Sequence, residues 1–203
     1  MKRKELLNRL DLSTFIAFDF ETTGLDHQND KIIEVAAIKF IDGEIVDRYV
    51  ELVNPGMSIP SVITEITGMS DKMVRSSQSE ELIIDDLLSF IGNNPLVAHN
   101  IHFDEKFLSQ LFNRLGRDIL KNAQYDTLQL ARSVLYDQPV FNLSALSEYF
   151  GLSSKGAHRA EKDTENTGLI FLELVDEVSK YSIETISIVN SMLKGTSIPN
   201  QKL

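Results

Sequence analysis

Two acidic side chains interrupt an apolar run near the start of the chain. The run FIAFDFETTGL begins at Phe15, and its acids are Asp19 and Glu21. Because successive side chains of a strand point to alternate faces, the two acids share one face, about 7 Å apart along the strand. Two like charges at the edge of a core repel each other and lose hydration. A divalent cation between them would offset both costs, so the pair predicts a metal site.

Further acids stand where other elements begin or end. Asp104 opens a helix after a short apolar strand, Asp163 lies near the start of a later helix, shortly after His158, and Asp126 closes a short strand segment. Active sites of α/β sheets collect at strand ends. Oxygen ligands without sulfur suit Mg²⁺ or Mn²⁺. Two such ions about 4 Å apart form the clamp used for in-line displacement at phosphorus.

Each of these acids also has a structural interpretation. A single Asp at a helix start commonly caps the helix or interacts with its dipole, and this holds for Asp104 and Asp163 taken alone. Asp126 is balanced between a cap and a site residue. A strand needs no cap, so Asp19 and Glu21 favour a site.

The other polar candidates have ordinary explanations as well. His158 alone is typical of a solvated loop, and His99 is expected to be a buried histidine with a satisfied ring. The basic residues Arg114, Arg117 and Lys121 are expected to form a solvated face.

The composition limits the class of protein. The chain has 203 residues, 42% of them hydrophobic, which suits one domain with a sizeable core. The absence of cysteine excludes disulfides, thiolate metal sites and a cysteine nucleophile, and fits a reducing cytoplasm. We expect no membrane span and no secretory signal. The net charge of −10 argues against a broad nucleic-acid surface, yet allows a small site that reaches phosphates through metal ions.

The elements that must position these side chains alternate between strands and helices. This order predicts an α/β fold with a mixed central sheet flanked by helices. Asp42 and Gly43 form the turn of a hairpin. The terminal residues 194–203 have the composition of a linker or tail. The expected strands are 15–20, 32–41, 44–53, 96–99 and 123–126, and the expected helices are 59–66, 79–91, 103–115, 127–135, 143–150, 161–178 and 183–193.

The order of the motifs resembles one family of nucleases. The segments are FDFETTGL at 18–25, EITGMSD at 65–71, VAHNIHFD at 97–104, YDTLQLAR at 125–132, NLSALSEYFGL at 142–152 and AHRAEKD at 157–163. Together, over residues 13–178, they resemble the DEDDh 3′→5′ exonucleases, the group that contains the proofreading epsilon subunit of bacterial DNA polymerase III. The sister group carries a tyrosine four residues before the last acid, where this chain has Arg159.

The resemblance implies a ribonuclease H-like fold and a site for two divalent metal ions, Mg²⁺ or Mn²⁺. Asp19 would bridge both ions. Glu21 and Asp163 would hold the ion that binds the attacking water, and Asp104 would help to place the second ion. His158 would be the general base that deprotonates the water.

The resemblance also implies a set of substrate contacts. One segment resembles the loop that touches the terminal nucleotide, and another resembles a wedge against the last base and sugar. His99 would support the site, and Glu65 departs from the family pattern because many relatives carry a histidine there. The implied substrate-binding residues are Thr22, Thr23, Gly24 and Leu25 in the loop, Ile66, Thr67 and Gly68 in the wedge, and Asn100 and Phe103.

We therefore expect a metal-dependent 3′→5′ exonuclease that releases nucleoside 5′-monophosphates from a single-stranded 3′ end, with DNA favoured over RNA. Two alternatives stay open: an RNA or short-oligonucleotide exonuclease, and a non-catalytic end-binding module of a larger polymerase or helicase protein. The expected partners are the nucleic-acid end and a DNA polymerase, or a fused helicase or polymerase domain. The expected organisation is a basic extension at 1–12, an exonuclease domain at 13–178, and a helix and tail at 179–203.

Overall fold

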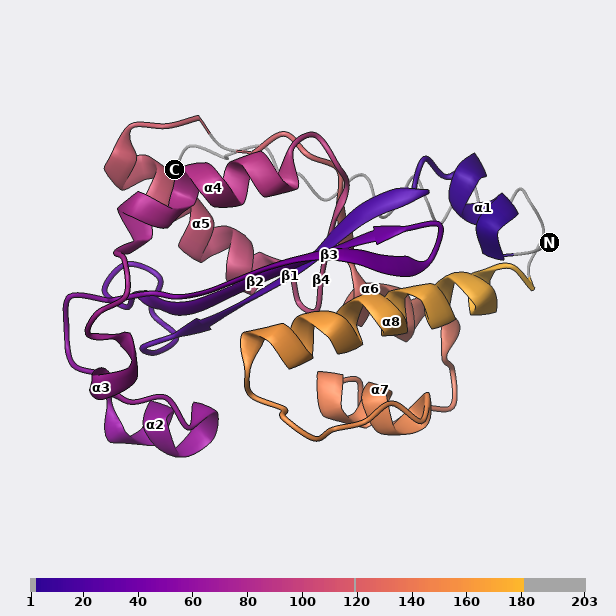
Figure 1. The fold of residues 1–203 in the computed structure, drawn as a ribbon. Coiled ribbons are helices and arrows are strands. Elements are labelled where there is room, and N and C mark those ends of the chain that lie inside the picture. The colour runs from indigo at the N-terminus through magenta and orange to yellow at the C-terminus, as the bar shows by residue number, and fades with distance from the viewer. Residues whose placement is uncertain (1–2, 119, 181–203) are drawn as a thin grey trace, which may run out of the picture.

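The computed structural model describes residues 3–118 and 120–180 (Figure 1). Its centre is a five-stranded sheet in the order β3-β2-β1-β4-β5. The pairs β1–β2 and β2–β3 are antiparallel, whereas β1–β4 and β4–β5 are parallel. The predicted α/β fold with a mixed sheet is therefore confirmed. The strands are β1 (Thr14–Thr22), β2 (Ile32–Ile41), β3 (Glu44–Leu52), β4 (Leu96–Ala98) and β5 (Gln124–Asp126).

Helices cover both faces of this sheet. In Figure 1, α4 (Glu80–Ile91) and α5 (His102–Leu115) lie above the sheet, and α6 (Thr127–Val134), α7 (Leu143–Tyr149) and α8 (Ala160–Val178) lie below it. Two short helices, α2 (Ser61–Thr67) and α3 (Asp71–Val74), belong to the connection between β3 and α4. At the N-terminus, α1 (Arg3–Arg9) contributes buried leucines to the same core as α8.

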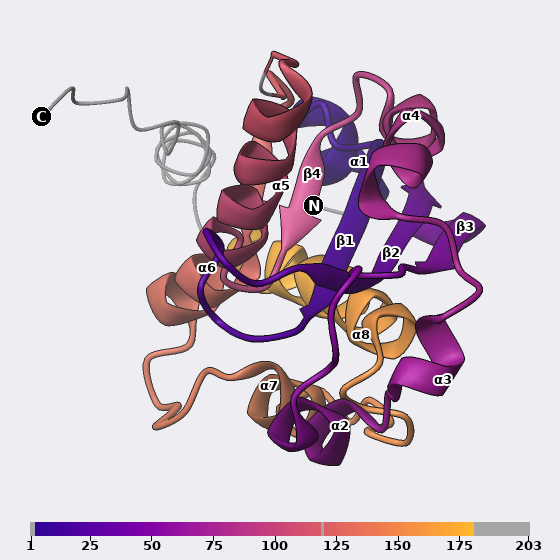
Figure 2. The same cartoon turned by 90° about the vertical axis from the view of Figure 1, so that its left-hand side faces the viewer.

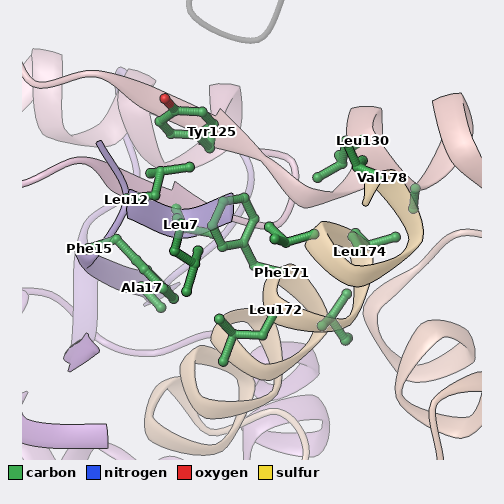
Figure 3. Packing of buried hydrophobic residues seen from close by; sticks show 14 of the residues in the cluster. Leu7, Leu12, Phe15, Ala17, Tyr125, Leu130, Phe171, Leu172, Leu174 and Val178 are labelled. Atoms are coloured by element: carbon green, nitrogen blue, oxygen red, sulfur yellow. The ribbon is translucent and has the colours of Figure 1, made fainter. Parts of the chain in front are cut away.

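Strand β1 is buried on both faces, which explains its nearly continuous apolar run. Phe15 and Ala17 belong to the cluster that includes α8, and Ile16 and Phe18 belong to the cluster that includes α4 and α5. Figure 3 shows Phe15 and Ala17 among the apolar side chains of α8. The ring of Phe15 lies 5.1 Å from the ring of Phe171, centroid to centroid. The side chains of β1 therefore alternate between two cores.

A glycine lets α8 approach the sheet closely. A Cβ atom at Gly168 would lie 2.3 Å from the ring of Phe40 and 3.3 Å from the Cβ of Ala17. No larger residue fits there without movement of the ring. The close approach brings the first turn of α8 to the end of β1 that carries Asp19.

Most predicted elements exist within one to three residues of their expected bounds. The first strand runs on to Thr22 and so includes both acids. The sequence reasoning missed α1 and α3. Leu6 and Leu7 of α1 are buried in the core. The expected helix 183–193 and tail 194–203 lie outside the described residues.

Arg114, Arg117 and Lys121 are all exposed, as the sequence predicts. Two of them also form ion pairs. Arg114 bonds to Glu80, a buried carboxylate that also accepts from Lys31 at 3.1 Å, and Arg117 pairs with Asp85. These two arginines therefore tie α5 and the loop after it to α4. Within residues 3–118 and 120–180, no helix has both the length and the apolar composition that a membrane crossing requires.

Candidate active site

Three carboxylates meet where β1 ends beside the start of α8. Asp19 and Glu21 continue the row of Phe15 and Ala17, so they face the same side as α8. Asp163 comes from the first turn of α8. Among the described residues, these three acids form a group in which one carboxylate oxygen from each lies within 4.8 Å of the other two, and each side chain is half-buried. Such a set of hard oxygen donors fits a divalent cation.

The electrostatics of this group favour a bound cation. Desolvation, followed by the charges of Asp104, Glu21 and Asp163, raises the pKa of Asp19 well above its ordinary value. Desolvation and the charge of Asp163 raise the pKa of Glu21 to about 7. Desolvation also raises the pKa of Asp163, although a hydrogen bond from the backbone of His158 opposes that shift. A cation would relieve both the repulsion and the lost hydration.

Asp104 approaches from another helix. It stands in the first turn of α5, is buried, and its Oδ1 accepts a hydrogen bond from the backbone N–H of Phe20 at 3.2 Å. Burial raises the pKa of Asp104 to about 8. Asp104 is not part of the group of three, but after burial its charge is the largest contribution to the raised pKa of Asp19. All four predicted acids therefore share one electrostatic neighbourhood.

His158 reaches this neighbourhood through its main chain. Its backbone N–H donates to Oδ2 of Asp163 at 3.0 Å, and its φ of 62° lies in the left-handed region. The residue is exposed, as expected for a loop histidine. The backbone of the predicted base therefore contacts one of the acids, and its side chain lies at the surface.

The two threonines after Glu21 use their hydroxyl groups inside their own loop. Thr22 Oγ1 donates to the carbonyl oxygen of Gly24 at 2.6 Å, and Thr23 Oγ1 donates to Oδ1 of Asp30 at 2.8 Å. A Cβ atom at Gly24 would lie 2.3 Å from the carboxylate of Asp30, so this glycine has a steric reason besides closeness to substrate. Leu25 is 82% exposed and is the member of this loop that is available to a ligand.

Three of the predicted substrate residues share a surface hollow. Its volume is about 160 Å³. Asn100 adopts a φ of 63°, and its backbone N–H is held by Oδ1 of Asp126 at 3.0 Å. Sequence reasoning gave no role to His102 or Lys106, because neither breaks the pattern of its helix. The lining residues are Leu25, His27, Asn100, His102, Phe103, Lys106 and Phe107.

The predicted wedge residues lie elsewhere. Ile66 is exposed near the end of α2, Thr67 is buried with its hydroxyl bonded to the carbonyl of Ile63, and Gly68 ends the helix with a φ of 71°. None of the three lines the hollow described above. In this segment only Ile66 offers an exposed apolar side chain.

Asp126 acts as a helix cap. The sequence alone allows either a cap or a site residue at this position. The Oδ1 of Asp126 accepts from the backbone N–H of Leu128 at 2.9 Å, at the start of α6. His99 has a satisfied ring, since its Nδ1 lies 2.9 Å from Oγ1 of Thr127. Burial lowers the pKa of His99.

Sequence reasoning missed an ion pair beside the acids. Glu34 of β2 is 1% exposed and stands opposite Glu21 in the strand register. Both of its carboxylate oxygens accept from the guanidinium of Arg159. The signal was present in the sequence, because Glu34 breaks an apolar strand much as Asp19 does.

Comparisons with known proteins agree with this geometry. The model of the RNase_T family, described as Exonuclease, matches residues 16–171. The DNA polymerase III PolC-type of Caldanaerobacter subterraneus is 35% identical over 189 residues, which are 93% of this chain and 13% of that protein. The protein of the same name in Thermotoga petrophila is 37% identical over 180 residues, 89% of this chain and 13% of the relative. The chain thus spans a small part of these relatives.

Solved structures share the fold. Exonuclease X in complex with 5′ overhanging duplex DNA has a TM-score of 0.67 and 25% identity, over 87% of this chain and 99% of that one. E. coli Exonuclease I in complex with a dA16 oligonucleotide has a TM-score of 0.71 and 20% identity, over 87% and 45% of the two chains. The mixed sheet, its ribonuclease H-like arrangement and the family match lead to one conclusion. This chain belongs to the RNase_T family of DEDD-type exonucleases, which are phosphodiester hydrolases.

Proposed function

We propose that this protein removes nucleoside 5′-monophosphates from the 3′ end of single-stranded DNA by two-metal hydrolysis. The observation that carries the proposal is the group of Asp19, Glu21 and Asp163, with all three oxygens within 4.8 Å, in a chain of exonuclease ancestry. Without a cation the three carboxylates repel one another, so their close grouping favours a metal-binding role over a purely structural one.

In this proposal the four acids would hold two ions, Mg²⁺ or Mn²⁺. Asp19 would serve both ions, Glu21 and Asp163 would hold one, and Asp104 would support the other. When bound, the ions would supply a more acidic water and a stabilised leaving oxygen. The protein contributes a rigid frame for these carboxylates, because β1, α5 and α8 are each anchored in the core.

His158 is the proposed general base. Imidazole is the side chain that most often serves this role, and the base must be within hydrogen-bond reach of the water in the substrate complex. An exposed position beside Asp163 supports this role, since the ring can turn toward a substrate that arrives from solvent.

The hollow lined by Leu25, Asn100 and Phe103 is the proposed seat of the terminal nucleotide. Apolar and aromatic side chains can pack on any base, and Lys106 adds a positive charge for a phosphate. Thr22, Thr23 and Gly24 would shape the loop that carries Leu25. Ile66, with Thr67 and Gly68 behind it, would touch the substrate from α2. DNA is favoured because the related solved structures contain DNA.

The decisive experiment compares DNA and RNA strands labelled at the 3′ or the 5′ end, with Mg²⁺, Mn²⁺ or EDTA. We expect rapid release of 3′-terminal mononucleotides from DNA, slower release from RNA, and none in EDTA. Asp19→Ala and Asp163→Ala should abolish release, whereas Glu51→Ala, which removes an exposed acid of β3, should not. Wild-type activity in the Asp19→Ala variant would overturn the proposal, and binding of ends without cleavage would indicate an end-binding module.

We also infer that this protein acts as the proofreading exonuclease of a DNA polymerase, with residues 13–178 as the exonuclease unit. The relatives named DNA polymerase III PolC-type, of which this chain spans 13%, support this inference. A proofreading unit should remove a mispaired 3′ nucleotide faster than a paired one, because a frayed end enters a single-strand site more readily. Equal rates on matched and mismatched primer ends would argue against proofreading and for general DNA degradation.

A further inference from the structure

The segment that carries His158 has few anchors of its own. Residues 153–156 are exposed, and His158 adopts a left-handed φ of 62°. A residue other than glycine pays on the order of 1–2 kcal/mol for that conformation. Arg159, the residue before the first turn of α8, makes no side-chain capping bond to the helix. The bond from the His158 N–H to Asp163 and the bond from the Asn166 side chain to the carbonyl oxygen of Ser153 hold part of the segment. The residues that follow His158 have a further hold from outside the segment.

Glu34 supplies that hold from β2. Its Oε2 accepts from Nε of Arg159 at 3.1 Å and from the backbone N–H of Ala160 at 2.9 Å, while its Oε1 accepts from the second guanidinium nitrogen. One buried carboxylate thus fixes two residues that follow His158 directly. A planar guanidinium that meets both carboxylate oxygens also fixes direction, which a single contact would not.

Glu34 is not placed to bind metal itself. Both of its oxygens are already occupied by donors, and it is absent from the group formed by Asp19, Glu21 and Asp163. Its charge nevertheless raises the pKa of Glu21, and the charge of Arg159 lowers that pKa again. At Glu21 the two charges of the pair therefore oppose each other.

We propose that Glu34 and Arg159 are positioning residues that fix His158 over the metal-binding acids. The proposal rests on the assignment of His158 as the general base. Arg159 acts on the position of the histidine rather than on the start of α8, because the bond from Ala160 to Glu34 holds the start of α8 without it. Neither residue needs to touch the substrate.

A double-mutant cycle tests this pair. Arg159→Met should lower kcat at least about 10-fold, within the range that a general base contributes, with KM changed less than about 2-fold. In a His158→Ala background the same substitution should change kcat less than about 3-fold, because the base is already gone. Titration with Mn²⁺ alone should show that Arg159→Met still binds the metal, so that its lower kcat is not a loss of the ion.

Two further variants serve as controls for the double-mutant cycle. Arg48→Met is the matched control, since Arg48 also pairs with α8, through Glu161 at 3.3 Å and Glu165 at 2.6 Å, and neither partner is Glu34 or a direct neighbour of His158 in the chain. It should keep wild-type kcat. Loss of Arg159 leaves a buried charge that can unfold the protein. Glu34→Gln combined with Arg159→Met removes both charges, retains an acceptor for Ala160, and should show the same dependence on His158.

An equal loss of kcat in the presence and absence of His158, or a folded Arg159→Met variant with wild-type kcat, would overturn the inference. A different result would show that His158 is not the general base. That result is a wild type without metal-dependent cleavage, or a His158→Ala variant with undiminished kcat.

Discussion

Burial, followed by repulsion from the negative charges of Asp104, Glu21 and Asp163, raises the pKa of Asp19. Replacement by asparagine keeps the shape of the side chain and removes the repulsion. We expect Asp19→Asn to lose exonuclease activity and, in EDTA, to unfold at a higher temperature than the wild type. Release of labelled 3′ nucleotides measures the first effect, and thermal unfolding in EDTA measures the second. Glu51→Gln should alter neither, and a lower unfolding temperature for Asp19→Asn in EDTA would contradict the electrostatic account.

Asp126 links a helix cap to the hollow. Its Oδ1 holds the start of α6 through Leu128 and also the backbone of Asn100. Asp126→Ala should lower the free energy of unfolding by about 1–2 kcal/mol, as for other lost caps, and should raise KM because Asn100 loses its support. Urea unfolding and steady-state kinetics test the two parts.

A second cap provides the control. Asn142→Ala removes the hydrogen bond that the backbone N–H of Ala145 donates to Asn142 Oδ1 at the start of α7. It should cost a similar free energy and leave KM unchanged. A KM increase of equal size in both variants would show that general destabilisation, not the position of Asn100, is responsible.

At the scale of elements, the distance between α8 and the sheet depends on Gly168. Alanine is a better helix former than glycine by about 1 kcal/mol, yet its Cβ would overlap the ring of Phe40. Overpacking of a core costs typically about 1–3 kcal/mol, so we expect Gly168→Ala to destabilise the protein. The urea midpoint measures this. In a Phe40→Leu background the same change should cost less, and an equal cost there would refute the steric explanation.

The sequence allowed most of these elements to be predicted because their signals are local. The Asp19–Glu21 pair breaks an apolar strand, and α4, α5 and α8 show helical spacing of apolar residues. Helix α3 has 4 residues and is too short for a periodic pattern, and α1, RKELLNR, has two adjacent leucines among polar residues and so shows no helical spacing. The pairing of Glu34 with Arg159, 125 residues apart, depends on how β2 and α8 pack, which no local pattern encodes. Nor does a local pattern show that Asp126 also accepts a hydrogen bond from the backbone of Asn100.

At the scale of the molecule, the acids make stability depend on pH. Glu21, with a pKa of about 7, and Asp104, with a pKa of about 8, lie above their ordinary values of 4.5 and 3.8. The folded protein therefore binds more protons than the unfolded chain between about pH 4 and 8, and its stability without metal should fall as pH rises through this window. Asp85, whose pKa Arg117 lowers, has the opposite effect only at lower pH.

Mg²⁺ should change this profile. Metal binding requires deprotonated carboxylates, so the stabilisation by Mg²⁺ should be larger at pH 8 than at pH 6. Urea unfolding at both pH values, with Mg²⁺ or EDTA, measures the difference. An Asp19→Asn variant should have a flatter profile in EDTA. Equal stabilisation by Mg²⁺ at both pH values in the wild type would contradict the raised pKa values.

The acids come from opposite ends of the described chain: Asp19 from β1 and Asp163 from α8, the last helix that the structure describes. During synthesis the N-terminal strands leave the ribosome first, and contacts distant in sequence form late. A growing chain therefore carries Asp19 and Glu21 long before Asp163 and His158 exist beside them. The nascent protein, surrounded by messenger and ribosomal RNA, holds an incomplete set of carboxylates, so the ability to cut nucleic acid arises only with the finished fold.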